Sequence, residues 1–216
     1  MLANAPDRLS AEIPASAFPL RLHLGGQPLE IYDSFHLMLH KPVGCVTALT
    51  DGRYPTAASF LAGAPLLREL RPVGRLDLDT SGLLLWTTDG NWLHRLAHPR
   101  TAVPRGYHAA LSRPFRPLPA DLVLRDGHRP RILDLRRLPT EEIHPGLLRP
   151  EGQSVFAAIT IVGGAYHEVR RIFAALGSHV LGLCRVSFGN LALPRELTAG
   201  DWRPVARENV GPGPPP

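Results

Sequence analysis

The sequence predicts an α+β fold in which helices pack on one side of a sheet. Strand-like and helix-like segments mix along its 216 residues without the regular alternation of a doubly wound fold. The chain is long enough to bury a full core, and its 44% hydrophobic and 20% charged residues are typical of globular proteins. It contains no apolar run of about 18 residues and no signal-peptide pattern. We therefore expect a cytoplasmic protein with no membrane contact.

The first half of the chain supplies strand signals and one clear helix start. The segment FPLRLHLGGQPLEIY predicts two short strands joined by a Gly-Gly turn, and FHLMLH predicts an apolar strand that runs into a Pro-Gly turn. The segment YPTAASFLAGAPLLREL predicts helical turns with Thr56 as N-cap. Asp89 or Asn91 can cap a short helix that carries Trp92 and Leu96 on one face.

The second half begins with weak periodicity and ends with strong patterns. Residues 100–150 are rich in Pro and Arg, and we expect strands such as RGYHAALS and RILDLRRL joined by exposed loops. The segment VFAAITIVGG predicts a strand, YHEVRRIFAALG a helix that ends at Gly177, and VLGLCRVSFGNLAL a strand, a turn and a strand. We expect the Pro- and Gly-rich tail, residues 208–216, to be disordered.

The charge balance favours a phosphate-rich partner. The chain has 24 Lys and Arg residues and 19 Asp and Glu residues, which gives a net charge of +5. Lys41 is the only lysine in this background of arginines, which suggests that its position needs a compact ammonium group. Cys45 and Cys184 have neither metal-site nor disulfide spacing, and we interpret them as small buried hydrophobic residues.

The stretch GRLDLDTSGLLLWTTDG concentrates the candidate chemistry in three aspartates. They suit a hard cation, although a turn or cap role suffices for Asp89. In an extended segment Asp77 and Asp79 would point to one face, as a glycosidase pair does, but the polar residues that follow predict a bend that separates them. The residues alone leave two hypotheses: a surface turn without chemistry, or one reactive carboxylate beside Arg75 with Asp79 bonding backbone N–H groups.

Two arginines, Arg170 and Arg171, stand at the start of the predicted helix YHEVRRIFAALG. Cations are unfavourable at a helix N-terminus, so two in a row call for a reason. They are either a solvated pair, or one of them reaches a buried carboxylate and keeps it ionised.

Three stretches in order resemble the pseudouridine synthases, in the branch of the RsuA-like ribosomal RNA enzymes. GRLDLDTSGLLLWTTDG resembles the family signature, HKPVG its entry segment, and YHEVRRIFAALGSHVLGLCRVSFGNLAL with LTAGDWRPV its C-terminal motif. The resemblance covers residues 36–207, which we expect to form the catalytic domain. It implies a mixed, largely antiparallel central sheet with a catalytic cleft, and chemistry without metal or cofactor.

The same resemblance implies roles for individual residues. Asp77 matches the catalytic aspartate, Tyr107 the active-site tyrosine, and Arg170 the basic residue that pairs with the aspartate. Arg75 matches the position that holds the flipped nucleotide or fills the space it vacates. The other expected substrate contacts come from Lys41, from Arg105 (where most relatives have lysine) and from Arg171.

The sequence departs from the family pattern at two places. Glu168 replaces the usual glutamine, so a second carboxylate either competes for Arg170 or faces away. Residues 1–35 are too few for the family's separate RNA-binding module, and we expect them to be its remnant or a linker. RNA affinity must then come from the cleft and from the arginine-rich middle: Arg113, Arg116, Arg129, Arg131, Arg136 and Arg137.

We expect a monomeric RNA pseudouridine synthase that isomerises one uridine of ribosomal RNA, either naked or in an assembly intermediate. The YHEVRR form favours a small-subunit position, whereas the missing module favours a large-subunit position. The alternatives are a catalytically inactive RNA-binding or ribosome-assembly protein on the same fold, and a glycosidase that uses Asp77 and Asp79.

Overall fold

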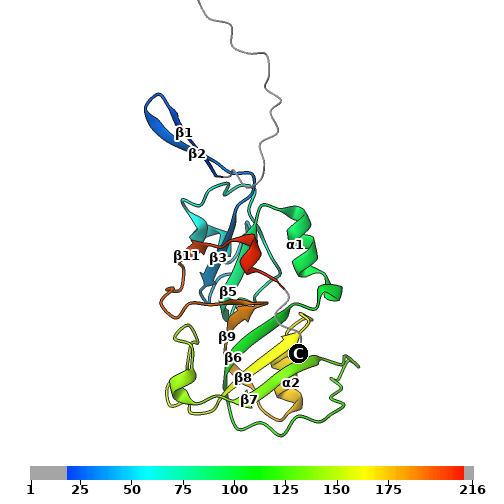
Figure 1. Cartoon of the computed structure of the whole chain (residues 1–216). Coiled ribbons are helices and arrows are strands. Elements are labelled where there is room, and N and C mark those ends of the chain that lie inside the picture. The colour runs from blue at the N-terminus through cyan, green and yellow to red at the C-terminus, as the bar shows by residue number, and fades with distance from the viewer. Residues whose placement is uncertain (1–18, 212–216) are drawn as a thin grey trace, which may run out of the picture.

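The computed structural model describes residues 19–211, which form two antiparallel N-terminal strands and a body of strands with short helices (Figure 1). The α-helices are α1 (Gly90–Ala97) and α2 (Glu168–Ala175), and the short 3-10 helices are Ala57–Leu61, Pro99–Thr101, Thr140–Glu142 and Arg207–Asn209. The strands are β1 (Leu20–Leu24), β2 (Gln27–Ile31), β3 (His36–Lys41), β4 (Arg71–Pro72), β5 (Thr80–Thr87), β6 (Pro104–Leu111), β7 (Arg131–Arg137), β8 (Phe156–Val162), β9 (Val180–Phe188), β10 (Leu191–Ala192) and β11 (Trp202–Pro204).

The body is one nine-stranded sheet with the order β11-β3-β5-β9-β6-β8-β7, in which β4 also pairs with β5 and β10 with β9. Only β5 and β9 run parallel, and every other pair is antiparallel. The predicted α+β class and the mixed, largely antiparallel sheet are therefore confirmed.

The two helices cover opposite faces of the sheet, so the expectation of helices on one side is wrong. Trp92 and Leu96 of α1 pack with Met38 and Leu85, whereas Ile172 of α2 belongs to a second core with the strand residues of the other parity. Because side chains alternate across a strand, the all-buried strands β3 and β5 contribute to both cores. Which helix meets which face depends on the strand order, which the local sequence does not show.

Gly82 lets β5 and β9 approach closely at the place where they run parallel. Its φ is +111°, and a Cβ there would lie 2.3 Å from the backbone oxygen of Arg185. No other residue type fits without moving one of the strands. The contact holds the start of β5 against β9, and the turn that carries Asp77 lies directly before it.

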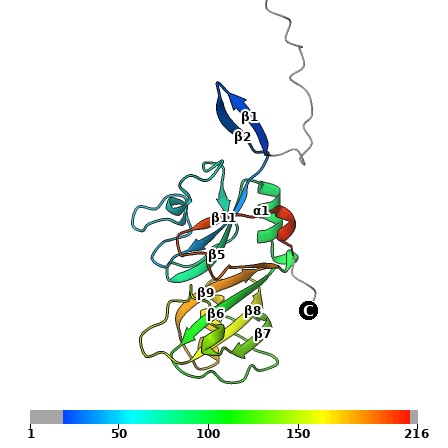
Figure 2. The ribbon, with the colours of Figure 1, turned by 60° about the vertical axis from the view of Figure 1, so that its left-hand side comes forward.

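The N-terminal strands form the predicted hairpin, which projects away from the sheet in both views (Figures 1 and 2). Its turn is Gly25-Gly26, both with positive φ, as a tight hairpin requires. Leu22 and Leu24 are exposed on it, so the hairpin adds little to the core. Whether it belongs to an RNA-binding module stays a prediction, and residues 1–18 lie outside the described residues.

The predicted caps and tail have mixed outcomes. Asp89 caps α1 by accepting a hydrogen bond from the Trp92 N–H at 2.9 Å, as expected. Thr56 stands at the N-cap of the helix Ala57–Leu61 but makes no capping bond with its side chain.

The tail is not disordered from residue 208: Val210 is buried, and the Gly211 N–H donates to Asn190 Oδ1 at 2.7 Å. Residues 212–216 lie outside the described residues.

Both cysteines are buried free thiols, which confirms their interpretation as small hydrophobic residues. Burial raises the pKa of the Cys184 thiol to about 11, so this thiol stays protonated at neutral pH.

Candidate active site

Asp77 lies in a tight turn between β4 and β5 that neighbouring segments hold from two sides. The Thr80 N–H donates to the Asp77 carbonyl at 3.1 Å, and the Gly44 N–H donates to the Leu78 carbonyl at 2.7 Å. The Thr47 hydroxyl donates to the Leu76 carbonyl at 2.8 Å and accepts from the Leu76 N–H at 3.0 Å. The bend that the sequence predicted is therefore a turn with most of its backbone groups satisfied.

Lys41 supports this turn from behind and does not face the solvent. Its side chain is fully buried, and its ammonium donates to the carbonyls of Pro42, Asp77 and Thr80 at 2.9, 3.0 and 2.9 Å. Burial lowers the pKa of Lys41, and the neighbouring Cys45, Asp77 and Asp79 oppose this shift. The expected substrate contact of Lys41 is therefore wrong, but a compact ammonium with three donors explains why this position is a lysine.

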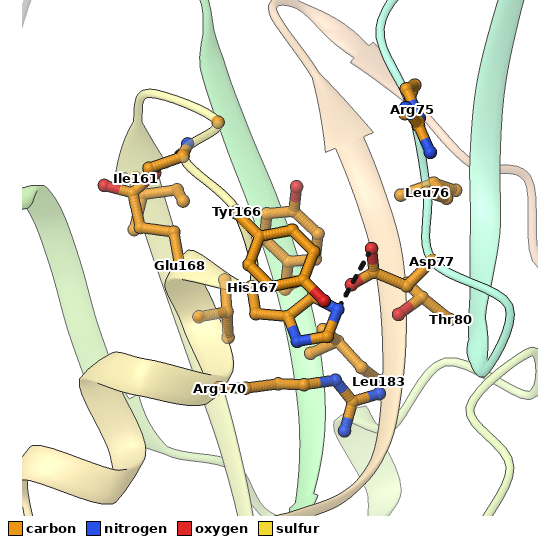
Figure 3. A pocket seen from close by; sticks show the side chains of 14 residues that line it. Arg75, Leu76, Asp77, Thr80, Ile161, Tyr166, His167, Glu168, Arg170 and Leu183 are labelled. Carbon is orange, nitrogen blue, oxygen red and sulfur yellow. Dashed lines mark hydrogen bonds and ion pairs between the residues drawn. The ribbon is translucent and has the colours of Figure 1, made fainter.

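A cavity of about 360 Å³ opens between this turn and the start of α2. Figure 3 shows Arg75 and Asp77 on one wall, with Tyr166, His167 and Arg170 on the other. Tyr107, which is 8% exposed on β6, lines the cavity together with apolar side chains. These apolar residues are Leu76, Ile161, Val169 and Leu183.

The group nearest to the Asp77 carboxylate on the opposite wall is His167, which the sequence reasoning missed. His167 Nε2 lies 3.6 Å from Asp77 Oδ1, and its ring stacks on Tyr166 with 3.9 Å between centroids. His167 has a φ of +50°, a left-handed conformation that non-glycine residues rarely adopt and that is common at functional sites. The one sequence feature that could have indicated His167 is its position directly before the predicted helix that carries Arg170.

Arg170 pairs with Asp79, and the predicted pair with Asp77 is wrong. Arg170 Nη2 lies 2.8 Å from Asp79 Oδ1, although without hydrogen-bond alignment, and Nη1 donates to the Val180 carbonyl at 3.2 Å. The turn separates the two carboxylates, and the outer one, Asp79, reaches the guanidinium instead of bonding backbone N–H groups. The Nε group of Arg170 is also buried, and it has no hydrogen-bond acceptor among residues 19–211.

The three remaining predicted contacts fall in different places. Arg75 is exposed at the rim of the cavity, and Arg105 lines a neighbouring cavity. Arg171 faces away from the site: it forms an ion pair with Asp126 and donates to the Tyr166 carbonyl at 3.2 Å, so the prediction that it binds substrate is wrong. All six arginines of the arginine-rich middle are exposed: Arg113, Arg116, Arg129, Arg131, Arg136 and Arg137.

Glu168 does not compete for Arg170. Its carboxylate is 4% exposed, accepts from the Ala165 N–H at 3.0 Å and lies 2.8 Å from His128 Nε2. It thereby ties the loop before α2, which carries His167, to a residue 40 positions earlier. His128 had no signal in the sequence, because its partner is distant in the chain.

The cavity thus combines a carboxylate, a buried phenol and a guanidinium with one unused donor around an apolar lining. Such a set suits nucleophilic or acid–base chemistry on a flat ring with polar edges. Among residues 19–211, no group of three His, Cys, Asp or Glu side chains is placed to hold a metal ion. No helix in this range is long and apolar enough to cross a membrane.

Comparison with known proteins decides the family. Residues 36–175 match the family model described as RNA pseudouridylate synthase. The chain belongs to this family. It is therefore an RNA pseudouridine synthase, an isomerase, and the expected resemblance is confirmed.

Two curated relatives are ribosomal small subunit pseudouridine synthases A. The one from Haemophilus influenzae is 35% identical over 184 residues, 83% of this chain and 74% of the relative. The one from Escherichia coli K12 is 35% identical over 187 residues, 86% of this chain and 77% of the relative. A solved pseudouridylate synthase structure aligns over 92% of this chain and 81% of its own, with 29% identity and a TM-score of 0.63.

Proposed function

We propose that this RNA pseudouridine synthase isomerises one uridine of small-subunit ribosomal RNA, with Asp77 as the catalytic carboxylate. The observation that carries the proposal is the position of Asp77, whose carboxylate lies opposite His167 and Arg170 in a cavity that Tyr107 also lines. The match of Asp77, Tyr107 and Arg170 to the family motifs supports the same assignment. The names of the relatives support the small-subunit substrate.

The reaction conserves every atom of the uridine. The bond from N1 of uracil to C1′ of ribose breaks, the base turns in the cavity, and a bond from C5 to C1′ forms. C5 loses its proton and N1 gains one. The Asp77 carboxylate assists either by adding to the uracil ring or by taking part in detaching the base from the ribose.

The other lining residues have separate roles in this reaction. Tyr107 lies against the base and moves a proton, and the free Nε donor of Arg170 binds an oxygen of the base or the developing charge. The apolar lining excludes water while the base is detached. The target nucleotide must leave its stack, at a cost of a few kcal/mol, and Arg75 at the rim holds the opened strand.

A map of pseudouridine in ribosomal RNA tests the substrate. Cells with and without the gene are compared, and the deleted strain is complemented with wild type or with Asp77→Asn. We expect one small-subunit site to disappear and to return only with wild type. Loss of a large-subunit site instead would correct the substrate. An unchanged map would favour the inactive RNA-binding protein.

A further inference from the structure

A second cavity, of about 560 Å³, lies beside the first and shares part of its wall. Both are lined by Arg75, Tyr107, Gly164 and Ala165. The side chains that line the second cavity include three arginines and two histidines but no aspartate or glutamate: Arg75, His98, Arg105, His128 and Arg185. It is therefore a strongly cationic space in direct continuation of the Asp77 cavity.

Arg185 gives the strongest indication that this second cavity binds an anion. Its side chain is 1% exposed, its Nε donates to the Leu83 carbonyl at 2.7 Å, and its buried Nη2 has no hydrogen-bond partner among residues 19–211. Burying an unpaired guanidinium costs free energy that a bound anion would recover. The free donor indicates that the cavity is built for a negatively charged group.

Arg105 adds a second cation without an ion pair among residues 19–211. The guanidinium carbons of Arg105 and Arg185 lie 5.3 and 5.4 Å from the centroid of the same Phe188 ring. Burial, and next the charge of Arg185, lower the pKa of Arg105. The charge of Glu168 opposes this pKa shift, but its carboxylate is already bound to the Ala165 N–H and to His128. Two like charges held together in this way favour an anion between them.

We propose that this second cavity binds a backbone phosphate of the RNA, at the linkage next to the flipped uridine, through Arg105 and Arg185. The inference rests on the proposed function, since a nucleotide in the Asp77 cavity brings its own phosphates to the shared wall. Arg75 closes the site from the rim. The phosphate contact orients the ribose and thus sets which bond lies beside Asp77.

The test uses two dinucleotides that differ in one charge: UpU and its analogue with a neutral methylphosphonate linkage. The side-chain Nε–H signals of Arg105 and Arg185 are followed by NMR during titration of the full chain. We expect UpU to shift both signals and to bind about tenfold more tightly than the neutral analogue, the value of one charge-assisted contact. Free uridine should leave both signals in place.

Matched variants test whether Arg105 causes the preference for the charged linkage. Arg105→Gln should weaken UpU binding about tenfold and remove the preference for the charged linkage, whereas Arg105→Lys should keep most of that preference. Arg68→Gln removes the same charge from an exposed residue that lines neither cavity, and it should bind like wild type.

Three results would overturn the proposal: equal affinity for the charged and neutral dinucleotides, no movement of either arginine signal with UpU, or a preference that survives in Arg105→Gln. The pseudouridine map is independent of this test. If UpU shifts the signals but the map shows no lost site, the phosphate site stands and the proposed substrate fails. If the map shows a lost site and the signals do not move, only the phosphate site fails.

Discussion

The two walls of the Asp77 cavity are built in different ways. The Asp77 wall is a turn at the start of an all-buried strand, held from behind by Lys41 and from the side by Gly44 and Thr47. The opposite wall is a loop that carries the 77% exposed Tyr166 and the left-handed His167, and it is held through Glu168. The difference indicates that the carboxylate is fixed by the core, whereas the residues facing it depend on a few polar contacts.

The Asp77 wall should be the more sensitive to loss of its support. Lys41→Met leaves three carbonyls, one of them buried, without their donor, so we expect the free energy of unfolding to fall by about 4 kcal/mol and activity to fall with it. Lys41→Arg should not rescue stability, because a planar guanidinium does not match three converging carbonyls. Denaturant unfolding measures both variants, and wild-type stability of Lys41→Met would refute the supporting role.

Low pH should reduce the stability of the protein through His108, which lies on the face of the sheet opposite to the Asp77 cavity. On β6, Tyr107 lines the cavity, while His108 accepts from the His144 N–H at 3.1 Å. Burial, with nearby cations, lowers the pKa of His108 from 6.5 to about 4. The folded protein therefore favours neutral His108, and its contribution is complete above pH 6.5 and lost as the pH falls toward 4.

This loss amounts to about 3 kcal/mol for a shift of this size. Denaturant unfolding between pH 7.5 and pH 4 should show it in wild type. His108→Asn keeps an acceptor but has no such titration, so its stability should fall less steeply over the same range. Identical slopes for both proteins would contradict the assignment.

The Nε donor of Arg170 should matter to catalysis more than the ion pair of Nη2 with Asp79 does. Arg170→Ala removes the free Nε donor together with the charge, and we expect kcat to fall about 100-fold with little change in stability. Asp79→Asn keeps the Nε donor and removes an ion pair to a carboxylate that is 66% exposed, so kcat should change about threefold or less. If the two variants lose activity equally, the pair itself is the functional unit.

Changes at Glu168 should have the smallest effect on kcat. They test whether Glu168 positions the His167 wall without touching the substrate. Glu168→Gln keeps an acceptor for the Ala165 N–H, so we expect kcat within about threefold of wild type. Glu168→Ala leaves this N–H unpaired and should lower kcat about tenfold while KM changes less. Rescue by glutamine but not by alanine identifies a positioning role, and equal loss in both would contradict it.

Sequence reasoning found the elements and the central aspartate but not the partners across the cavity. Strand patterns, the Asp89 cap and the bend after Asp77 are local, so neighbouring residues determine them. The partners are not local: Glu168 meets His128 across 40 positions, and Arg170 meets Asp79 because of the way the turn separates two carboxylates. The buried position of Lys41 likewise depends on three carbonyls that converge only in the fold.

The most direct test of the account compares Asp77→Asn with Asp79→Asn in pseudouridine formation on small-subunit ribosomal RNA under single-turnover conditions. The exchange keeps the size of the side chain, but at one of two neighbouring positions it removes the carboxylate charge and replaces one acceptor oxygen with an NH2 donor. The account predicts that Asp77→Asn binds RNA, folds like wild type and loses about 10⁴-fold or more in rate, whereas Asp79→Asn stays close to wild type. Turnover by Asp77→Asn near the wild-type rate, or an inactive but stable Asp79→Asn, would contradict it.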